Sequence, residues 1–278
     1  MNDIRAPVTG AVHARLDVEP FEDTALLRFP RLGRFDRLIH VITTRPWNMA
    51  PHRGPHRELA ILRRQRLCAH LGVPFERLTA PDQIHSPHVV RVDEADVGAG
   101  RFGRDSAIRF VDGLVCDLPD TPLLQLSGDC PLILVHDPVR HALGTAHASW
   151  RGTVAGAAGL LVRRLTAEFG SRPADLWAGI APCAGAERYE VGAEVRRVAL
   201  AMLPDADRFF ATYAGKLCFD LKSANADALL TAGVPAAQIE VAAECTLSDA
   251  RFFSHRREGP DAGRFALVAA VRAAHASA

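Results

Sequence analysis

Four extended stretches follow one another between residues 113 and 146, with no helical pattern between them. They are short and mostly apolar, at Gly113–Cys116, Leu123–Ser127, Leu132–His136 and Ala142–Ala146. Amphipathic or apolar helical patterns lie outside this run, at Glu58–Leu71, Thr153–Phe169, Val191–Leu203 and Ser223–Thr231. Strands and helices therefore mix without strict alternation, and we expect an α/β fold of mixed sheets with flanking helices rather than a doubly wound nucleotide-binding fold.

Length and composition set limits on the function. A chain of 278 residues, 48% of them hydrophobic, is long enough to bury a sizeable core. Its net charge of +1 gives no reason to expect a nucleic-acid partner. The first 20 residues do not have the pattern of a signal peptide, and no run of about 20 apolar residues follows. We expect a soluble, cytoplasmic protein with no membrane partner, whose residues 1–30 form an irregular or edge segment.

The stretch from residue 126 to 152 brings a cysteine and a histidine together. Asp137-Pro138-Val139-Arg140 favours a type I turn, which would pair His136 with His141 and Cys130 with His147. Directly opposed residues share a face, with Cβ atoms about 4.5–5.5 Å apart. One zinc ion could then bind both side chains, with His85 or His88 as a third ligand. A buried cysteine beside a hydrogen-bonded histidine, or a cysteine hydrolase, remains an alternative.

Six short blocks, taken in order, resemble the signature of one family. They are Gln83–His85, Asp112–Val115, Ser127–Pro131, His147–Gly152, Ala181–Gly185 and Arg251–Gly259. Together they resemble the laccase-domain or "polyphenol oxidase" family with the YfiH-like fold, over roughly Val41 to Val268. The resemblance implies a single laccase-type domain of mixed α/β sheets, which we expect over residues 31–278.

The same resemblance implies a metal site and a reaction. The metal would be Zn²⁺, with copper as the alternative, held by His85, Cys130 and His147. Members of the family are similar to zinc-dependent purine nucleoside phosphorylases, which cleave adenosine, inosine or methylthioadenosine with phosphate, and some are similar to adenosine deaminases. We therefore expect an enzyme whose partners are a nucleoside and phosphate.

Several further residues are candidates for catalysis or substrate binding. Arg45 and Arg151 could bind phosphate, the latter beside the start of a helix near Thr153. Asp129 could act as an acid or base in deamination, or orient a metal ligand. We expect Phe253 to stack on the purine and Arg257 to contact the substrate.

Some positions depart from the family pattern. A Ser/Thr-Arg-x-Gly-Gly block is usual near the N-terminus, but here Arg45 is followed by Pro46 and Trp47. Gly128, Ser149 and Ser86 replace the usual Ala, Gly and Gly, and Thr246–Ser248 replaces Thr-Tyr-Cys. The altered loop at Pro46 and Trp47 keeps one alternative open, a non-catalytic metal-binding or regulatory module. The family's older label leaves a second, a copper-binding polyphenol oxidase. The chain contains no His-x-His pair, a pairing typical of multicopper sites.

Overall fold

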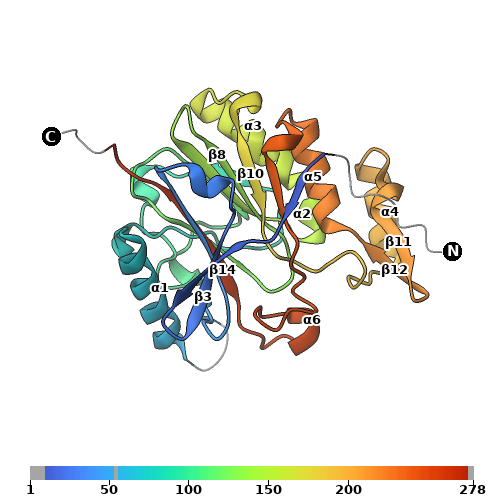
Figure 1. The fold of residues 1–278 in the computed structure, drawn as a ribbon, viewed down its shortest axis with the longest axis horizontal. Coiled ribbons are helices and arrows are strands. Elements are labelled where there is room, and N and C mark those ends of the chain that lie inside the picture. The colour runs from blue at the N-terminus through green and yellow to red at the C-terminus, as the bar shows by residue number, and fades with distance from the viewer. Residues whose placement is uncertain (1–9, 53–55, 275–278) are drawn as a thin grey trace.

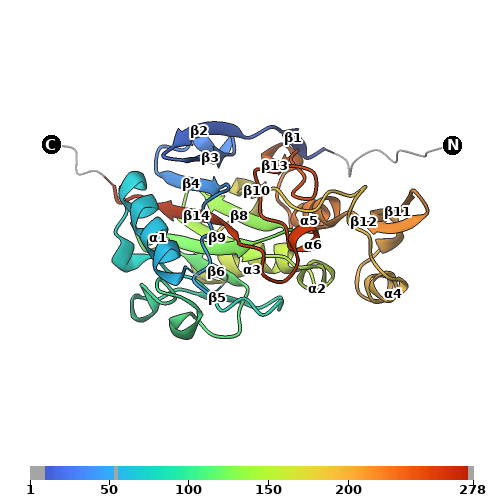
Figure 2. The same cartoon turned by 90° about the horizontal axis from the view of Figure 1, so that it is seen from below.

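Two large sheets stack face to face in the computed structural model, which describes residues 10–52 and 56–274 (Figures 1 and 2). Within these residues the first sheet has seven strands, in the order β1 (Val12–Ala14), β13 (Ile239–Ala242), β10 (Trp177–Ile180), β8 (Leu132–Asp137), β9 (Ala142–His147), β6 (Gly113–Cys116) and β5 (Val89–Arg91). The second has five described strands, in the order β2 (Asp17–Phe21), β3 (Thr24–Arg28), β4 (Leu38–Thr43), β14 (Phe265–Val271) and β7 (Leu123–Ser127). The first sheet contains both parallel and antiparallel pairs, so the predicted mixed α/β fold is confirmed.

Alternation along β8 explains why the sheets are layered with helices. Leu132 and Leu134 belong to the core between the two sheets, whereas Ile133 and Val135 belong to the core on the opposite face. That opposite face is covered by α3 (Ala157–Phe169) and α5 (Leu221–Thr231). Side chains of successive strand residues point to opposite faces, so a strand buried on both sides needs an unbroken apolar sequence.

The remaining helices cover the other surfaces. Helix α1 (Arg57–Leu71) packs on the outer face of the five-stranded sheet and ends at Gly72, whose φ of 64° permits the left-handed cap. A hairpin of β11 (Phe210–Tyr213) and β12 (Lys216–Phe219) packs with α4 (Ala193–Met202) to one side. The short α6 (His255–Glu258) precedes β14.

The helix predicted over Thr153–Phe169 is in fact two helices. Helix α2 (Trp150–Val154) is capped by the Ser149 hydroxyl, which accepts a hydrogen bond from the Gly152 N–H, and α3 begins at Ala157. Gly156 lies between them with a φ of 74°, a left-handed conformation that interrupts the helical hydrogen bonds. The predicted start near Thr153 is therefore wrong by about one turn.

Three strands occupy residues 12–28, where the sequence predicts an irregular or edge segment. Strands β1 and β2 do lie at sheet edges, but β3 is internal, so the irregular assignment is wrong for this stretch. Pairing with β13 and β4 stabilises these strands, and such long-range pairing leaves little trace in the local sequence pattern. Residues 1–9 lie outside the described part of the chain.

The predicted register of the hairpin is wrong by two residues. In the structure His147 pairs with Leu132, and the last pair before the turn is Asp137 with Ala142. The Asp137 carboxylate accepts hydrogen bonds from the Val139 and Arg140 N–H groups, and His141 adds a left-handed residue with a φ of 52°. Such a residue corrects the mismatch in twist between a type I turn and the two strands.

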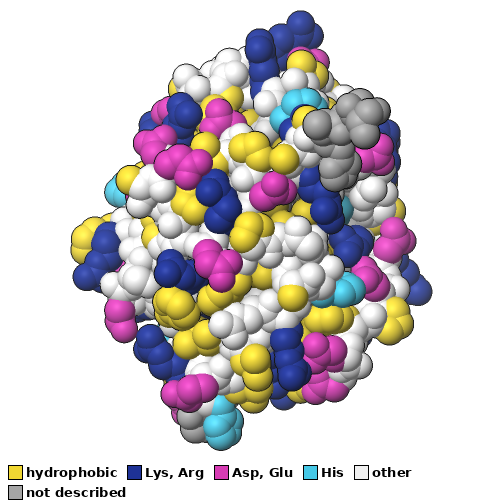
Figure 3. All heavy atoms as spheres, turned by 90° about the vertical axis from the view of Figure 1, so that its left-hand side faces the viewer, with side chains coloured by type: hydrophobic (Ala, Val, Ile, Leu, Met, Phe, Trp, Pro, Cys, Tyr) yellow, Lys and Arg dark blue, Asp and Glu magenta, His cyan; other side chains and the backbone are white. Residues whose placement is uncertain are grey.

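The surface carries charges of both signs. Lys and Arg side chains are interspersed with Asp and Glu over the face shown in Figure 3, in keeping with a net charge of +1. Within residues 10–52 and 56–274, none of the helices combines the length and the apolar character needed to span a lipid bilayer.

Two buried histidines, His40 and His136, should lower the free energy of unfolding in acid. Burial, reinforced by Arg28, lowers the pKa of His40 to about 3, and burial lowers the pKa of His136 to about 4. Both would titrate near 6.5 in the unfolded chain, which therefore binds more protons below that pH. We expect the free energy of unfolding to be unaffected by these groups above pH 6.5. It should fall by up to about 1.4 kcal/mol per pH unit for each histidine between pH 6.5 and pH 4.

Urea unfolding at pH 7.5, 6.0 and 5.0 measures this dependence. H136Q should flatten the slope, whereas V139A, at an exposed position in the same hairpin, should leave it unchanged. An unaltered slope in H136Q would assign the acid sensitivity to other groups.

Candidate functional site

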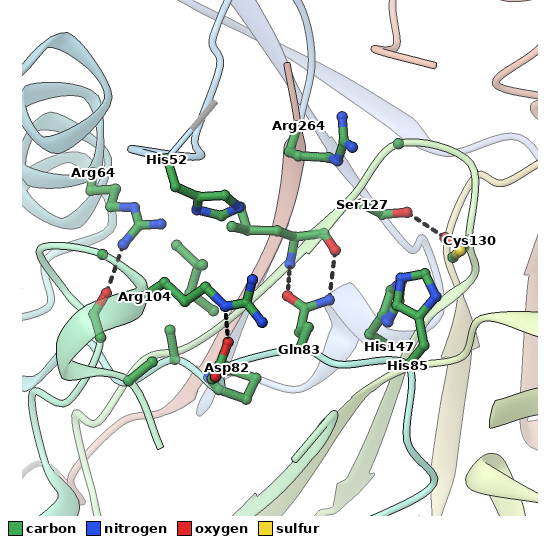
Figure 4. A pocket seen from close by; sticks show the side chains of 18 of the residues that line it. His52, Arg64, Asp82, Gln83, His85, Arg104, Ser127, Cys130, His147 and Arg264 are labelled. Atoms are coloured by element: carbon green, nitrogen blue, oxygen red, sulfur yellow. Dashed lines mark hydrogen bonds and ion pairs between the residues drawn. The ribbon is translucent and has the colours of Figure 1, made fainter. Parts of the chain in front are cut away.

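A cavity of about 250 Å³ opens beside the end of β7 (Figure 4). Its walls come from β7 and the loop after it, from residues 80–85, from the Gly-rich stretch at residues 97–106, and from α1. The volume is just below the range of about 300–1,000 Å³ that is typical of small-molecule sites. His85, Cys130 and His147 all line it, so the structure brings the three predicted metal ligands to one cavity.

His147 is held in place by a buried carboxylate. Asp112 immediately precedes β6, whose Gly113 pairs with Ala146 of β9, so the sheet places Asp112 beside His147. The Asp112 Oδ2 lies 2.8 Å from His147 Nδ1, and the two side chains are almost completely buried. This contact fixes the imidazole and leaves its Nε2 as the nitrogen available to a metal.

The same carboxylate also positions the loop that carries His85. Asp112 accepts hydrogen bonds from the N–H groups of Ile84 at 3.0 Å, His85 at 3.1 Å and Ser86 at 2.7 Å. Burial alone would raise the pKa of Asp112, but the contact with His147 and these N–H groups outweigh it and hold the pKa below its ordinary value. Asp112 therefore stays ionised and orients two of the three predicted ligands.

The charges of the three side chains depend on one another. Burial would lower the pKa of His147, but Cys130 and Asp112 outweigh burial and raise this pKa to about 9. The His85 ring lies 5.1 Å from the His147 ring between centroids. Partial burial and the neighbouring His147 lower the pKa of His85 to about 4, so His85 is neutral near pH 7.

The types of side chain at the site fit a metal, although they do not lie close enough together to form a complete coordination site. Among the described residues, no three His, Cys, Asp or Glu side chains are arranged as a ready-made metal site. Two imidazoles and a thiol are nevertheless the donors that zinc prefers, and the Asp112–His147 contact is the usual support of a metal-binding histidine. His88, the other candidate for the third ligand, lines a different groove together with Val90 and Phe110.

Asp129 is buried beside the cavity and makes two strong contacts away from it. Its Oδ1 accepts from the Thr246 hydroxyl and its Oδ2 from the Arg256 N–H, both at 2.7 Å. The residue has a φ of 114°, an unusual backbone conformation for a non-glycine residue. These contacts tie the Cys130 loop to two distant segments, and a catalytic role for Asp129 stays a prediction.

Arg45, Phe253 and Arg257 gather around Glu258, outside the lining of the cavity. Arg45 pairs with Glu258 at 2.8 Å, and its guanidinium lies 4.7 Å from the centre of the Phe253 ring. Arg257 also pairs with Glu258 at 2.8 Å and donates to the carbonyl oxygen of Thr246. Their roles toward the substrate stay predictions, and in the folded chain both arginines pair with Glu258.

Arg151 also lies outside the cavity lining. It sits in the first turn of α2, is exposed, and its guanidinium lies 4.3 Å from the centre of the Trp150 ring. The predicted position beside a helix start at Thr153 does not exist in the structure, because α2 begins earlier. Phosphate binding by Arg151 stays a prediction.

Asp112, which supports the site from outside the cavity lining, and several residues of the lining itself were not found from the sequence. Asp112 stands in one of the quoted blocks, and an acidic residue directly before an apolar strand is the signal that could have marked it. The remaining side chains that the sequence did not single out include Arg64, Asp82, Arg104, His255 and Arg264. The structure also explains why a glycine stands at position 128. A Cβ there would lie 3.3 Å from the Arg264 side chain, so the absence of a side chain leaves room for that arginine.

The sequence matches a known family. The model of the family described as "Multi-copper polyphenol oxidoreductase laccase" matches residues 40–272. The chain belongs to this family. The predicted resemblance is thereby confirmed, and family membership brings the expectation of a metal, copper or zinc.

Relatives within the family carry two kinds of name. "Purine nucleoside phosphorylase YlmD" from Geobacillus stearothermophilus is 35% identical over 220 residues, which are 78% of this chain and 80% of the relative. "Adenosine deaminase RL5" from an unknown prokaryotic organism is 32% identical over 206 residues, 72% of this chain and 78% of the relative. The crystal structure of YlmD from Geobacillus stearothermophilus superposes with a TM-score of 0.84 and 32% identity, over 92% of this chain and 100% of that one.

Proposed function

We propose that this chain is a zinc-dependent purine nucleoside phosphorylase that acts on adenosine, inosine or methylthioadenosine with phosphate. The observation that carries the proposal is the convergence of His85, Cys130 and His147 on one cavity, with Asp112 orienting two of them. The substrate class comes from the names of the relatives.

His85, Cys130 and His147 would hold the zinc, which would supply a Lewis acid in the cavity. Asp112 keeps Nδ1 of His147 engaged, so that the other ring nitrogen faces the site. His85 is neutral near pH 7, whereas His147, with its pKa of about 9, would have to release a proton when it binds zinc. Copper is the alternative metal, but the sequence has no His-x-His pair with which to build a multicopper cluster.

The reaction would form a bond between a phosphate oxygen and C1′ of the ribose and break the bond between C1′ and the purine. The base leaves with the proton of the attacking hydrogen phosphate, and the 1-phosphate of the sugar remains. The chain's own contribution is a cavity whose charged lining favours an anionic co-substrate, because Arg64, Arg104 and Arg264 are present there against a single described carboxylate, Asp82. Adenosine deamination is the second candidate, favoured by the relative named for it.

A product assay on protein of measured metal content tests the proposal. We expect adenosine with phosphate to give adenine and ribose 1-phosphate, and adenosine without phosphate to give little product. Inosine formed regardless of phosphate would move the assignment to deamination. Stoichiometric metal without turnover of adenosine, inosine or methylthioadenosine would favour the non-catalytic binding module and contradict the proposal.

A further inference from the structure

Arg64 is a buried cation at the end of the cavity opposite His85 and His147 (Figure 4). The residue lies on α1 and is only 2% exposed, although α1 is otherwise rich in exposed basic side chains. Its Nε donates to the Met49 carbonyl oxygen at 2.9 Å, and its Nη1 donates to those of Gly100 at 2.9 Å and Arg101 at 3.0 Å. The guanidinium is therefore fixed at the wall of the cavity.

No carboxylate among residues 10–52 and 56–274 balances the charge of Arg64. Its Nη2 donates no hydrogen bond within the described residues, and no described carboxylate pairs with the guanidinium. Burial lowers the pKa of Arg64 to about 10, which still leaves it protonated near pH 7. A buried positive charge without a negative partner is costly. An arginine in this situation at a cavity wall therefore indicates that an anion binds in the cavity and pairs with it.

The surroundings of Arg64 strengthen the case for an anion. A second arginine of the cavity lining, Arg104, lies on the Gly-rich stretch at residues 97–106. It is paired with Asp82, the only carboxylate among the described residues of the lining. Asp82 lies 3.8 Å from Arg109 as well, so its single negative charge is shared between two cations. The described side chains at the Arg64 end of the cavity therefore carry a net positive charge.

We propose that the Arg64 end of the cavity is a subsite for a phosphate group. A guanidinium held by fixed carbonyl contacts, with one amino group turned to the cavity, is suited to the oxygens of phosphate. Under the proposed function, on which this identification of the ligand rests, the group is the phosphate co-substrate. A phosphate ester carried by a nucleotide has the same chemistry and is the other source. The subsite lies away from Arg45 and Arg151, the arginines that the sequence suggests for phosphate.

Steady-state kinetics with varied inorganic phosphate test the subsite. R64Q should raise the KM for phosphate by about tenfold or more, because the charged contact with phosphate is lost, and should leave the KM for the nucleoside within about twofold. R66Q is the matched control, because Arg66 lies on the same helix, is exposed and pairs with Glu22. An unchanged KM for phosphate in folded R64Q, or an equal rise in both KM values, would overturn the proposal.

A second variant, with the opposite expected effect on the KM for phosphate, distinguishes the subsite from simple misfolding. D82N removes the carboxylate that pairs with Arg104 and should lower the KM for phosphate several-fold. Damage to the fold would not produce such a decrease. A KM for phosphate that rises or stays constant in D82N would count against the subsite.

Equilibrium binding separates this proposal from the phosphorylase proposal. Isothermal titration with inorganic phosphate alone needs no turnover, and binding should weaken in R64Q and tighten in D82N. If the wild-type protein binds phosphate in this way but cleaves no nucleoside, the proposed function fails and the subsite stands. Titration with adenosine 5′-monophosphate identifies the source: an Arg64-dependent affinity far above that of adenosine and of free phosphate would assign the subsite to a nucleotide instead of the free co-substrate. Absence of any phosphate binding would overturn the subsite.

Discussion

Replacing His147 with alanine is expected to remove the metal and the turnover together. His147 is the best fixed of the three proposed ligands, because β9 positions its backbone and Asp112 holds its ring at 2.8 Å. Loss of a group that only supports a metal ligand costs about 10–100-fold in affinity or activity, and loss of the ligand itself should cost more. Metal analysis after dialysis and the phosphorolysis assay measure the two effects on the same sample.

The chain offers a matched control for the histidines. H85A should behave like H147A, whereas H88A should retain both metal and turnover, because His88 lies three residues further on and lines a different groove. If H147A kept its metal and its activity, the proposed ligand set would be wrong.

Cys130 distinguishes the zinc enzyme from a cysteine hydrolase. C130S should lose metal in the same way as H147A, because a hydroxyl is a poor substitute for a thiolate ligand. Metal-free protein that still turns over substrate, and that is inactivated by alkylation of Cys130, would favour a nucleophilic cysteine. One sulfur cannot serve as a metal ligand and as a free nucleophile at the same time.

The layered fold could be predicted from apolar patterns, and the register of its central hairpin could not. The patterns along residues 113–146 and 58–71 are local, and they predict the strands and α1 correctly. The register depends on whether His141 adopts a left-handed conformation, which composition does not reveal. A slip of two residues keeps every side chain on its face, and for that reason Cys130 still lies near His147 although it is outside β8.

The proposed phosphate subsite could not be predicted from the sequence, for a different physical reason. Arg64 is one of several arginines on α1 and has no local feature that separates it from the exposed Arg66. Its burial arises from the Gly-rich stretch at residues 97–106, which lies more than thirty positions further along the chain and folds over the helix. The sequence suggests Arg45 and Arg151 for phosphate binding, yet both lie outside the cavity lining.

Asp112 is the residue whose loss should damage both stability and the site. The side chain is buried, with 1% of the residue exposed, and accepts hydrogen bonds from three backbone N–H groups while it contacts His147. D112A removes a charged acceptor from these part-buried donors, and hydrogen bonds to charged groups contribute about 1.5–3 kcal/mol each. We expect the free energy of unfolding to fall by several kcal/mol and metal affinity to fall by about 10–100-fold or more.

D112N separates the two effects because it keeps the shape of the side chain. The amide retains one oxygen for the N–H groups, so most of the stability should remain, but it carries no charge to fix the His147 ring. Metal affinity should therefore fall in D112N nearly as far as in D112A, while urea unfolding shows a smaller loss. D207A, which removes an exposed carboxylate paired with Arg196, is the control and should change neither quantity by much. Equal metal affinity in D112N and the wild-type protein would mean that Asp112 supports only the loop and has no influence on the metal ligands.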